Sequence, residues 1–98
     1  MIIAEISTAP VDKGIHLRNY VKAALRTLEE SGLNYQICPM GTCIEAPDTQ
    51  TLFDVMRKMH DTLVDMGCLR IVTSIKIDDR RDTDRRMLDK IDAVQISK

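Results

Sequence analysis

The sequence predicts an α+β domain in which a four-stranded antiparallel sheet carries two helices on one face. Two segments show the apolar spacing of amphipathic helices, and four others are short and alternating or β-branched, as strands are. Their order is β-α-β-β-α-β, followed by a short C-terminal helix or strand. That order is typical of the ferredoxin-like βαββαβ sandwich. We assign residues 1–98 to one domain, because a chain of this length forms one core and no linker or repeat interrupts it.

The chain begins with a predicted strand and a predicted helix. Residues 2–8 alternate between an apolar and a mixed face, and Pro10 ends this strand. Apolar residues at helical spacing then place a helix over residues 17–31, with Gly32 as its stop signal.

Two short extended segments follow the first helix. They cover residues 34–38 and 42–46, and Pro39-Met40-Gly41 lies between them. The spacing suits a hairpin, although a bulge that bends one long strand is the alternative.

The second half of the chain supplies a long helix, a long strand and a C-terminal extension. Asp48 is a candidate N-cap for the helix, and Gly67 closes it after a methionine-rich apolar stripe that we interpret as core. Residues 69–78 form the longest predicted strand. Met87, Leu88 and Ile91 then make one amphipathic turn, and residues 93–96 could add a short edge strand.

Composition excludes several classes of function. The net charge of −1, one Phe, two Tyr and no Trp argue against nucleic-acid binding by a basic field or by base stacking. No apolar run has the length of a membrane span, and the first ten residues lack the features of a signal peptide. We therefore expect a cytoplasmic protein, whose three cysteines are buried or half-buried thiols.

Two helices can cover only one face of such a sheet, so the other face meets water, a ligand or another subunit. In the last strand, alternation assigns the core face to Ile71, Thr73, Ile75 and Ile77. The open face then carries acids, hydroxyls and one lysine among apolar side chains: Ile3, Glu5, Ser7, Cys43, Glu45, Val72, Ser74 and Lys76.

Two interpretations of this open face are possible. One is cross-strand ion pairing of Glu5 or Glu45 with Lys76. The other is a small polar pocket, in which a carboxylate binds an amino-substituted heterocycle and hydroxyls fix its orientation.

The sequence contains no enzyme signature. It has no glycine-rich phosphate loop, zinc-ligand spacing or serine elbow. His16 and His60 have no visible partner that would make either a general base. We expect a protein that is not an enzyme and that needs no cofactor or metal.

Four stretches resemble the small thiamine-binding protein family, and together they cover nearly the whole chain: MIIAEISTAP, YVKAALRTLEESGLNYQICPMGTCIE, GCLRIVTSIKIDDRRD and LDKIDAV. The most specific pieces are Pro39-Met40-Gly41-Thr42 with Glu45, and the run from Thr73 to Arg81. The resemblance implies a ferredoxin-like fold that assembles into dimers and then a homotetramer, with open sheet faces buried against one another. It also implies binding of thiamine or its hydroxymethylpyrimidine half, without an established reaction.

The resemblance also suggests ligand-binding positions. Ser7, Thr42, Glu45 and Lys76 match family positions, and we expect them to face one pocket on the sheet; Glu5 and Ser74 of the open face complete the candidate set. A carboxylate and hydroxyls can bind the donors and acceptors on the edge of an aminopyrimidine, and the cationic thiazolium is favoured near an acid. Cys43 and the cysteine before Pro39 depart from the family pattern.

The segment from Asp78 to Asp92 contains six acids and five bases. Such a mixture favours salt bridges, within the loop or across a subunit boundary, over a nucleic-acid arm. Arg80 and Arg81 leave the end of a strand, where a guanidinium can bind a carboxylate or phosphate bidentately. A solvated loop, a subunit contact and a ligand contact are all open, and we favour the oligomer contact over the ligand contact.

The sequence therefore supports non-enzymatic binding of thiamine or its hydroxymethylpyrimidine moiety by a homo-oligomer, in a carrier, sensor or salvage role. The alternative is an oligomeric protein-interaction module without a small-molecule ligand. Membrane binding and nucleic-acid binding are not expected.

Overall fold

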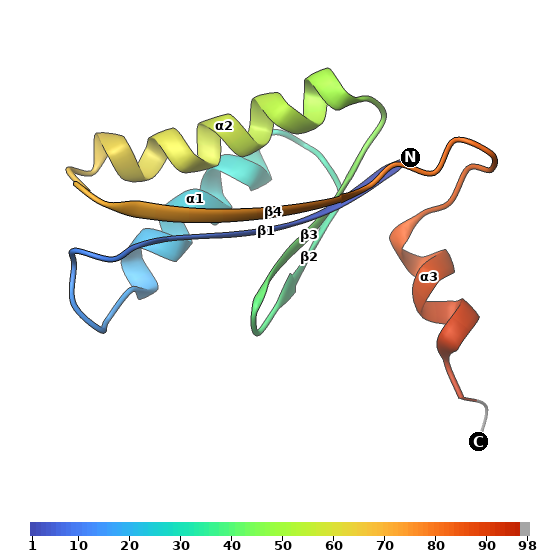
Figure 1. Cartoon of the computed structure of the whole chain (residues 1–98), viewed down its shortest axis with the longest axis horizontal. Helices are drawn as coiled ribbons and strands as arrows, with labels where there is room; N and C mark the ends of the chain where they lie inside the picture. The colour runs from blue at the N-terminus through green and yellow to red at the C-terminus, as the bar shows by residue number, and fades with distance from the viewer. Residues whose placement is uncertain (97–98) are drawn as a thin grey trace.

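The computed structural model describes residues 1–96 and contains a four-stranded antiparallel sheet with the strand order β2-β3-β1-β4 (Figure 1). Its elements, in chain order, are β1 (Ile2–Pro10), α1 (Arg18–Glu30), β2 (Tyr35–Cys38), β3 (Gly41–Ala46), α2 (Thr49–Asp65), β4 (Ile71–Asp78) and α3 (Met87–Val94). The predicted α+β ferredoxin-like fold is confirmed, and the break at Pro39-Met40-Gly41 is a hairpin turn between β2 and β3.

The predicted C-terminal edge strand is wrong. Residues 93 and 94 continue α3, and residues 95–96 form no strand. The physical reason is the start of this helix, where the Asp89 carboxylate accepts the Arg86 N–H at 2.9 Å and so satisfies a backbone donor that the first helical turn leaves free. Helical geometry then extends over the whole apolar segment.

The helix-covered face of the sheet forms the core. The β1–β3 register places Ile2, Ala4 and Ile6 opposite Ala46, Ile44 and Thr42, so these side chains share the face on which α1 and α2 pack. The apolar stripe of α2 supplies most of the helical contribution: Leu52, Val55, Met56, Met59 and Leu63 are buried. The interpretation of the methionine-rich stripe as core is confirmed for these five residues, but Met66, the last residue of the predicted stripe, is 41% exposed.

The face assignment of β4 is also confirmed. The β1–β4 register pairs Thr73 with Thr8 and Ile75 with Ile6, which places them on the helix-covered side. Ile75 and Ile77 nevertheless keep 44% and 37% of their surface exposed, because β4 is one of the two edge strands of the sheet.

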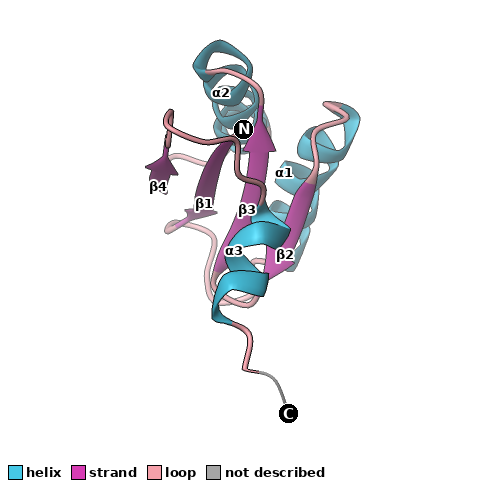
Figure 2. Cartoon of the chain, turned by 90° about the vertical axis from the view of Figure 1, so that its right-hand side faces the viewer, coloured by secondary structure: helices cyan, strands magenta, loops and turns pink. Residues whose placement is uncertain are grey.

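Helix α3 lies away from the other two helices. It follows the loop after β4 and stands at one end of the sheet, on the side opposite α2 (Figures 1 and 2). None of the helices in residues 1–96 is long and apolar enough to cross a lipid bilayer.

Candidate functional site

Four of the predicted ligand-binding residues lie together on the open face of the sheet. The β1–β4 register places Glu5 directly opposite Lys76 and Ser7 directly opposite Ser74, and all four residues are exposed. Within residues 1–96, Lys76 forms no ion pair with either Glu5 or Glu45. The open face is therefore polar at its centre, but the predicted cross-strand ion pair is not formed.

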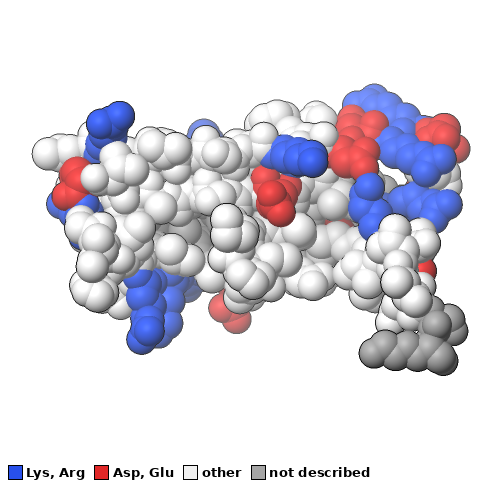
Figure 3. Space-filling model, turned by 60° about the horizontal axis from the view of Figure 1, so that its bottom comes forward, with Lys and Arg blue, Asp and Glu red and all other residues white. Residues whose placement is uncertain are grey.

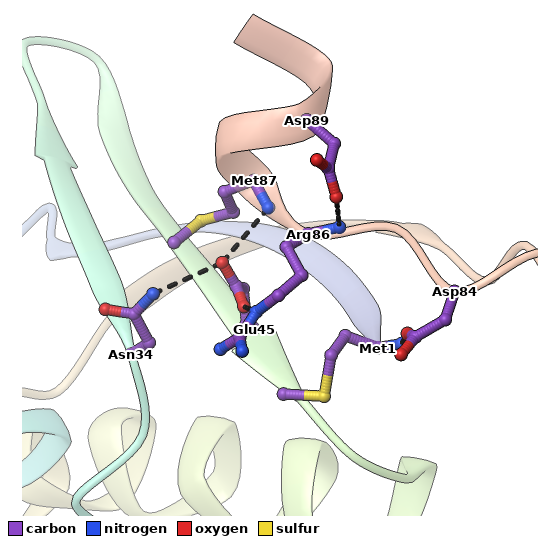
Figure 4. Close-up of polar contacts among 7 residues, drawn as sticks. All are labelled: Met1, Asn34, Glu45, Asp84, Arg86, Met87 and Asp89. Atoms are coloured by element: carbon purple, nitrogen blue, oxygen red, sulfur yellow. Dashed lines mark hydrogen bonds and ion pairs between the residues drawn. The ribbon is translucent and has the colours of Figure 1, made fainter. Parts of the chain in front are cut away.

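Glu45 is on the same face by register, but its carboxylate is enclosed rather than open to a ligand. The residue is only 1% exposed. One carboxylate oxygen accepts the Met87 N–H at 3.0 Å and the Asn34 amide at 3.2 Å. The other accepts Arg86 Nε at 2.7 Å (Figure 4). All three donors come from this chain.

These contacts determine the charge state of Glu45. Burial acts to raise the pKa of its carboxyl group, but the Arg86 guanidinium, the Met87 N–H and the Asn34 amide together hold that pKa below its ordinary value. The carboxylate is therefore ionised at neutral pH, and it binds the first turn of α3 to the sheet. A second contact, between Lys90 and Asp78 at 2.5 Å, joins the same helix to the end of β4.

The expectation that Thr42 shares a face with Glu45 is wrong. Thr42 pairs with Ile6 and is buried on the helix-covered side. The reason is the two-residue period of a strand: residues three positions apart point to opposite faces. Of the predicted set, Thr42 alone therefore belongs to the helix-covered surface, and the other residues belong to the open face.

Thr42 lines a groove on the helix-covered side of about 300 Å³, between α1, the end of β1 and the β2–β3 hairpin. The groove exists because the β1–β3 ladder ends at the Ile6–Thr42 pair while β1 continues to Pro10. Residues 7–9 consequently have no strand neighbour on that side. Their backbone faces a space lined by apolar side chains: Val21, Ala24, Leu25, Ile37, Met40 and Met59.

Polar groups in this groove are available to a ligand. Within residues 1–96 the Thr42 hydroxyl forms no hydrogen bond. Every fully buried side-chain nitrogen or oxygen in these residues has a partner, so the unpaired Thr42 hydroxyl must be accessible, and it opens to the groove that Thr42 lines. Ser7 and Thr8 also line the space. At the hairpin, a Cβ on Gly41 would lie 3.4 Å from the Glu5 Cγ, so Glu5 passes Gly41 on the open face of the sheet and not in the groove.

The structure thus places Glu5, Ser7, Ser74 and Lys76 on the open face with Glu45, and places Thr42 on the helix-covered face. Of the first group, Ser7 also borders the groove that Thr42 lines. Sequence reasoning missed Thr8 and the apolar walls from α1. The signal that could have found them is the hairpin at Pro39-Met40-Gly41, because a turn at that point stops β3 and leaves the rest of β1 uncovered.

Arginines of the charged segment after β4 pair with aspartates of the same segment. Arg80 binds the Asp82 carboxylate through Nε at 2.7 Å and Nη2 at 3.1 Å, and Arg81 binds Asp79 at 2.8 Å. Figure 3 shows charges of both signs gathered at one end of the molecule. Salt bridges within the loop are therefore present, and the predicted oligomer contact of both arginines stays a prediction.

Two of the three thiols lie on the β2–β3 hairpin. Cys38 and Cys43 are half-buried and Cys68 is buried, which agrees with the expectation from the sequence. Burial raises the pKa of Cys43, and the neighbouring Cys38 thiol raises it further. At neutral pH this thiol is protonated and weakly nucleophilic.

Comparisons with known proteins agree with this architecture. The family model described as thiamine-binding protein matches residues 4–95. A UPF0045 protein of Methanothermobacter thermautotrophicus is 38% identical over 96 residues, which are 97% of each chain. Among solved structures, protein MJ1052 of Methanocaldococcus jannaschii has a TM-score of 0.88 at 30% identity, over 95% of this chain and 94% of that one.

A more distant likeness supports the fold alone. A Thermotoga maritima protein named for thiamine biosynthesis or salvage has a TM-score of 0.79 at 16% identity, over 96% of this chain and 98% of that one. The sheet order and helix placement define a ferredoxin-like α+β protein with a groove at the open end of its β1–β3 ladder. Since the family model covers nearly the whole sequence, the chain belongs to the thiamine-binding protein family.

Replacing Glu45 by alanine should release α3 from the sheet. The change leaves the Met87 N–H, the Asn34 amide and Arg86 without their acceptor, and a buried donor left unpaired costs about 1–3 kcal/mol. We expect a lower thermal midpoint and a Met87 methyl resonance that moves to a solvent-exposed position. Glu5→Ala, which removes an exposed carboxylate from the same face, is the control and should leave both readouts unchanged.

Acid should detach the same helix. The folded pKa of Glu45 lies below its unfolded value, so the stabilisation is complete above the unfolded pKa of about 4.3 and is lost as pH falls through the folded pKa. The Met87 methyl resonance should be constant from pH 7 to about pH 5 and shift below about pH 4. An unchanged resonance down to pH 2 in a chain that is still folded would contradict this role of Glu45.

Proposed function

We propose that the chain binds thiamine or its hydroxymethylpyrimidine half, without transforming it, in the groove between α1 and the β2–β3 hairpin. One observation carries the proposal: in a chain of the thiamine-binding family, the β1–β3 ladder ends early and leaves a groove with a free hydroxyl beside the part of β1 that β3 does not cover. Its volume of about 300 Å³ is at the lower end of the range of small-molecule sites.

The chemistry of the groove suits an aminopyrimidine. A flat heterocycle has two apolar faces, and the side chains from α1 and the hairpin, including Met40, supply apolar and sulfur–aromatic contacts. The ring edge has acceptor nitrogens and a donor amine. The backbone of residues 7–9 and the hydroxyls of Thr8 and Thr42 offer the complementary donors and acceptors.

The Glu5 carboxylate bears on the second half of thiamine only beyond the groove. Glu5 lies on the open face, beside Gly41 of the hairpin, and does not line the groove. A cationic thiazolium that extends past the hairpin toward that face would be favoured by this carboxylate. Glu45 takes no part in this proposal, because its oxygens already accept three hydrogen bonds from the chain itself.

The proposal includes assembly of the cytoplasmic protein as a homo-oligomer, a dimer of dimers, with the open sheet face between copies. Support comes from apolar side chains that are exposed there and on α3: Val72, Leu88 and Val94. Ser74, Lys76, Arg80 and Arg81 would then contact other copies rather than the ligand. If no ligand binds, this same surface favours the alternative function, a protein-interaction module.

The decisive variant is Thr42→Val, which keeps the shape of the side chain and removes its hydroxyl. We expect calorimetric titration with hydroxymethylpyrimidine to show saturable binding to the wild type and about tenfold weaker binding to the variant, the loss of roughly one hydrogen bond. Ser74→Ala removes a hydroxyl from the open face and should leave the affinity unchanged.

Other results would point elsewhere. Weaker binding in Ser74→Ala, with normal binding in Thr42→Val, would place the ligand on the open face. Neither heat nor a thermal shift with thiamine or hydroxymethylpyrimidine would overturn the binding proposal and leave the interaction module.

A further inference from the structure

A chain of hydroxyls connects the groove to a histidine that the proposed function does not use. His60 Nδ1, on α2, lies 2.6 Å from Thr73 Oγ1 on β4. Thr73 Oγ1 in turn lies 2.7 Å from Thr8 Oγ1 on β1. All three side chains are partly buried where α2 packs on the sheet. We refer to them as the Thr8–Thr73–His60 relay.

The relay ends at the groove. Thr8 lines the groove, and so does Met59, the residue before His60. Thr8 and Thr73 are direct cross-strand partners, so their hydroxyls are held against each other by the register of the sheet. Whether the Thr8 hydroxyl donates or accepts a hydrogen bond in the groove therefore depends on where the His60 ring carries its proton, two hydrogen bonds away.

We propose that the Thr8–Thr73–His60 relay determines ligand specificity in the groove, by making Thr8 an acceptor that selects an amino-substituted pyrimidine over its oxo counterpart. The proposal rests on the proposed function and concerns the same groove. Amino and oxo pyrimidines have nearly the same shape, but one presents a donor where the other presents an acceptor.

The direction in which the hydrogen bonds of the relay are donated follows from the number of protons that each group carries. A threonine hydroxyl has one proton to donate and lone pairs to accept. When neutral His60 carries its proton on Nε2, Nδ1 accepts from Thr73, and Thr73 accepts from Thr8. Thr8 has then used its only proton, so it can offer the groove only lone pairs, which bind an amine and repel a carbonyl.

Protonation of His60 reverses this direction. An imidazolium must donate at Nδ1, so Thr73 accepts from it and donates to Thr8, which then donates into the groove. Among the groups around His60, the helix-covered residues of β1 and β4 contain no titratable side chain. On α2, Arg57 and Asp61 pair with each other at 3.6 Å, and the charged residues of α1 are all exposed: Arg18, Lys22, Arg26, Glu29 and Glu30.

The experiment compares two ligands and two matched variants. Hydroxymethylpyrimidine and its 4-oxo analogue are titrated into the wild type, Thr73→Val and Thr62→Val. Thr73→Val interrupts the relay without touching the groove. Thr62→Val is the control, because Thr62 belongs to a similar hydroxyl pair with Thr27, at 2.8 Å, between α1 and α2.

At pH 8 the wild type should prefer the amino ligand, and this preference should fall about tenfold in Thr73→Val but not in Thr62→Val. Protonation of the free pyrimidines is the same for every protein variant, so it cancels when variants are compared.

Two outcomes separate this proposal from the proposed function. Binding to the wild type with an equal preference in Thr73→Val would overturn the relay and leave the groove as the site. Nitrogen NMR of the ligand-free protein tests the relay without any ligand: we expect neutral His60 to carry its proton on Nε2. A neutral ring protonated on Nδ1 would overturn the proposal even if both ligands bind.

Discussion

The early end of the β1–β3 ladder is the constraint on which the rest of the account depends. The hairpin turn at Pro39-Met40-Gly41 starts β3 late, so its last partner on β1 is Ile6, and β1 continues to Pro10 with only β4 beside it. A strand with one unpaired side must satisfy its backbone by other means. Helix α1 covers this gap with apolar side chains, and the result is a groove with a polar edge and apolar walls.

The buried carboxylate of Glu45 has a structural role, in contrast to the polar groups of the groove. Removing an ionised carboxylate from water is costly unless donors replace the water. Here a backbone N–H, an amide and a guanidinium replace it, from segments far apart in the sequence. The group therefore ties the C-terminal helix to the sheet, and a ligand would have to displace the protein's own donors to reach it.

Much of the fold could be predicted from the sequence, because alternation and helical spacing are local signals. They gave the element order, the helix-covered face of β4 and the methionine-rich core. The candidate site was harder to predict. Thr42 and Glu45 lie three residues apart in one matching motif, and only the strand period shows that they point to opposite faces. The enclosure of Glu45 depends on how residues 86–87 fold back onto the sheet, which no local pattern reveals. The hydrogen-bond partner of His60 likewise comes from a strand thirteen residues further along the chain.

The central claim is that the ligand site is the groove and not the open face of the sheet. Chemical-shift mapping tests it most directly, with hydroxymethylpyrimidine titrated into isotope-labelled protein. The account predicts shifts concentrated in residues 7–9, Leu25, Ile37 and Thr42, while the amides of Ser74 and Lys76 stay in place. Shifts centred on Ser74, Lys76 and Glu45, with the α1 resonances unmoved, would contradict it.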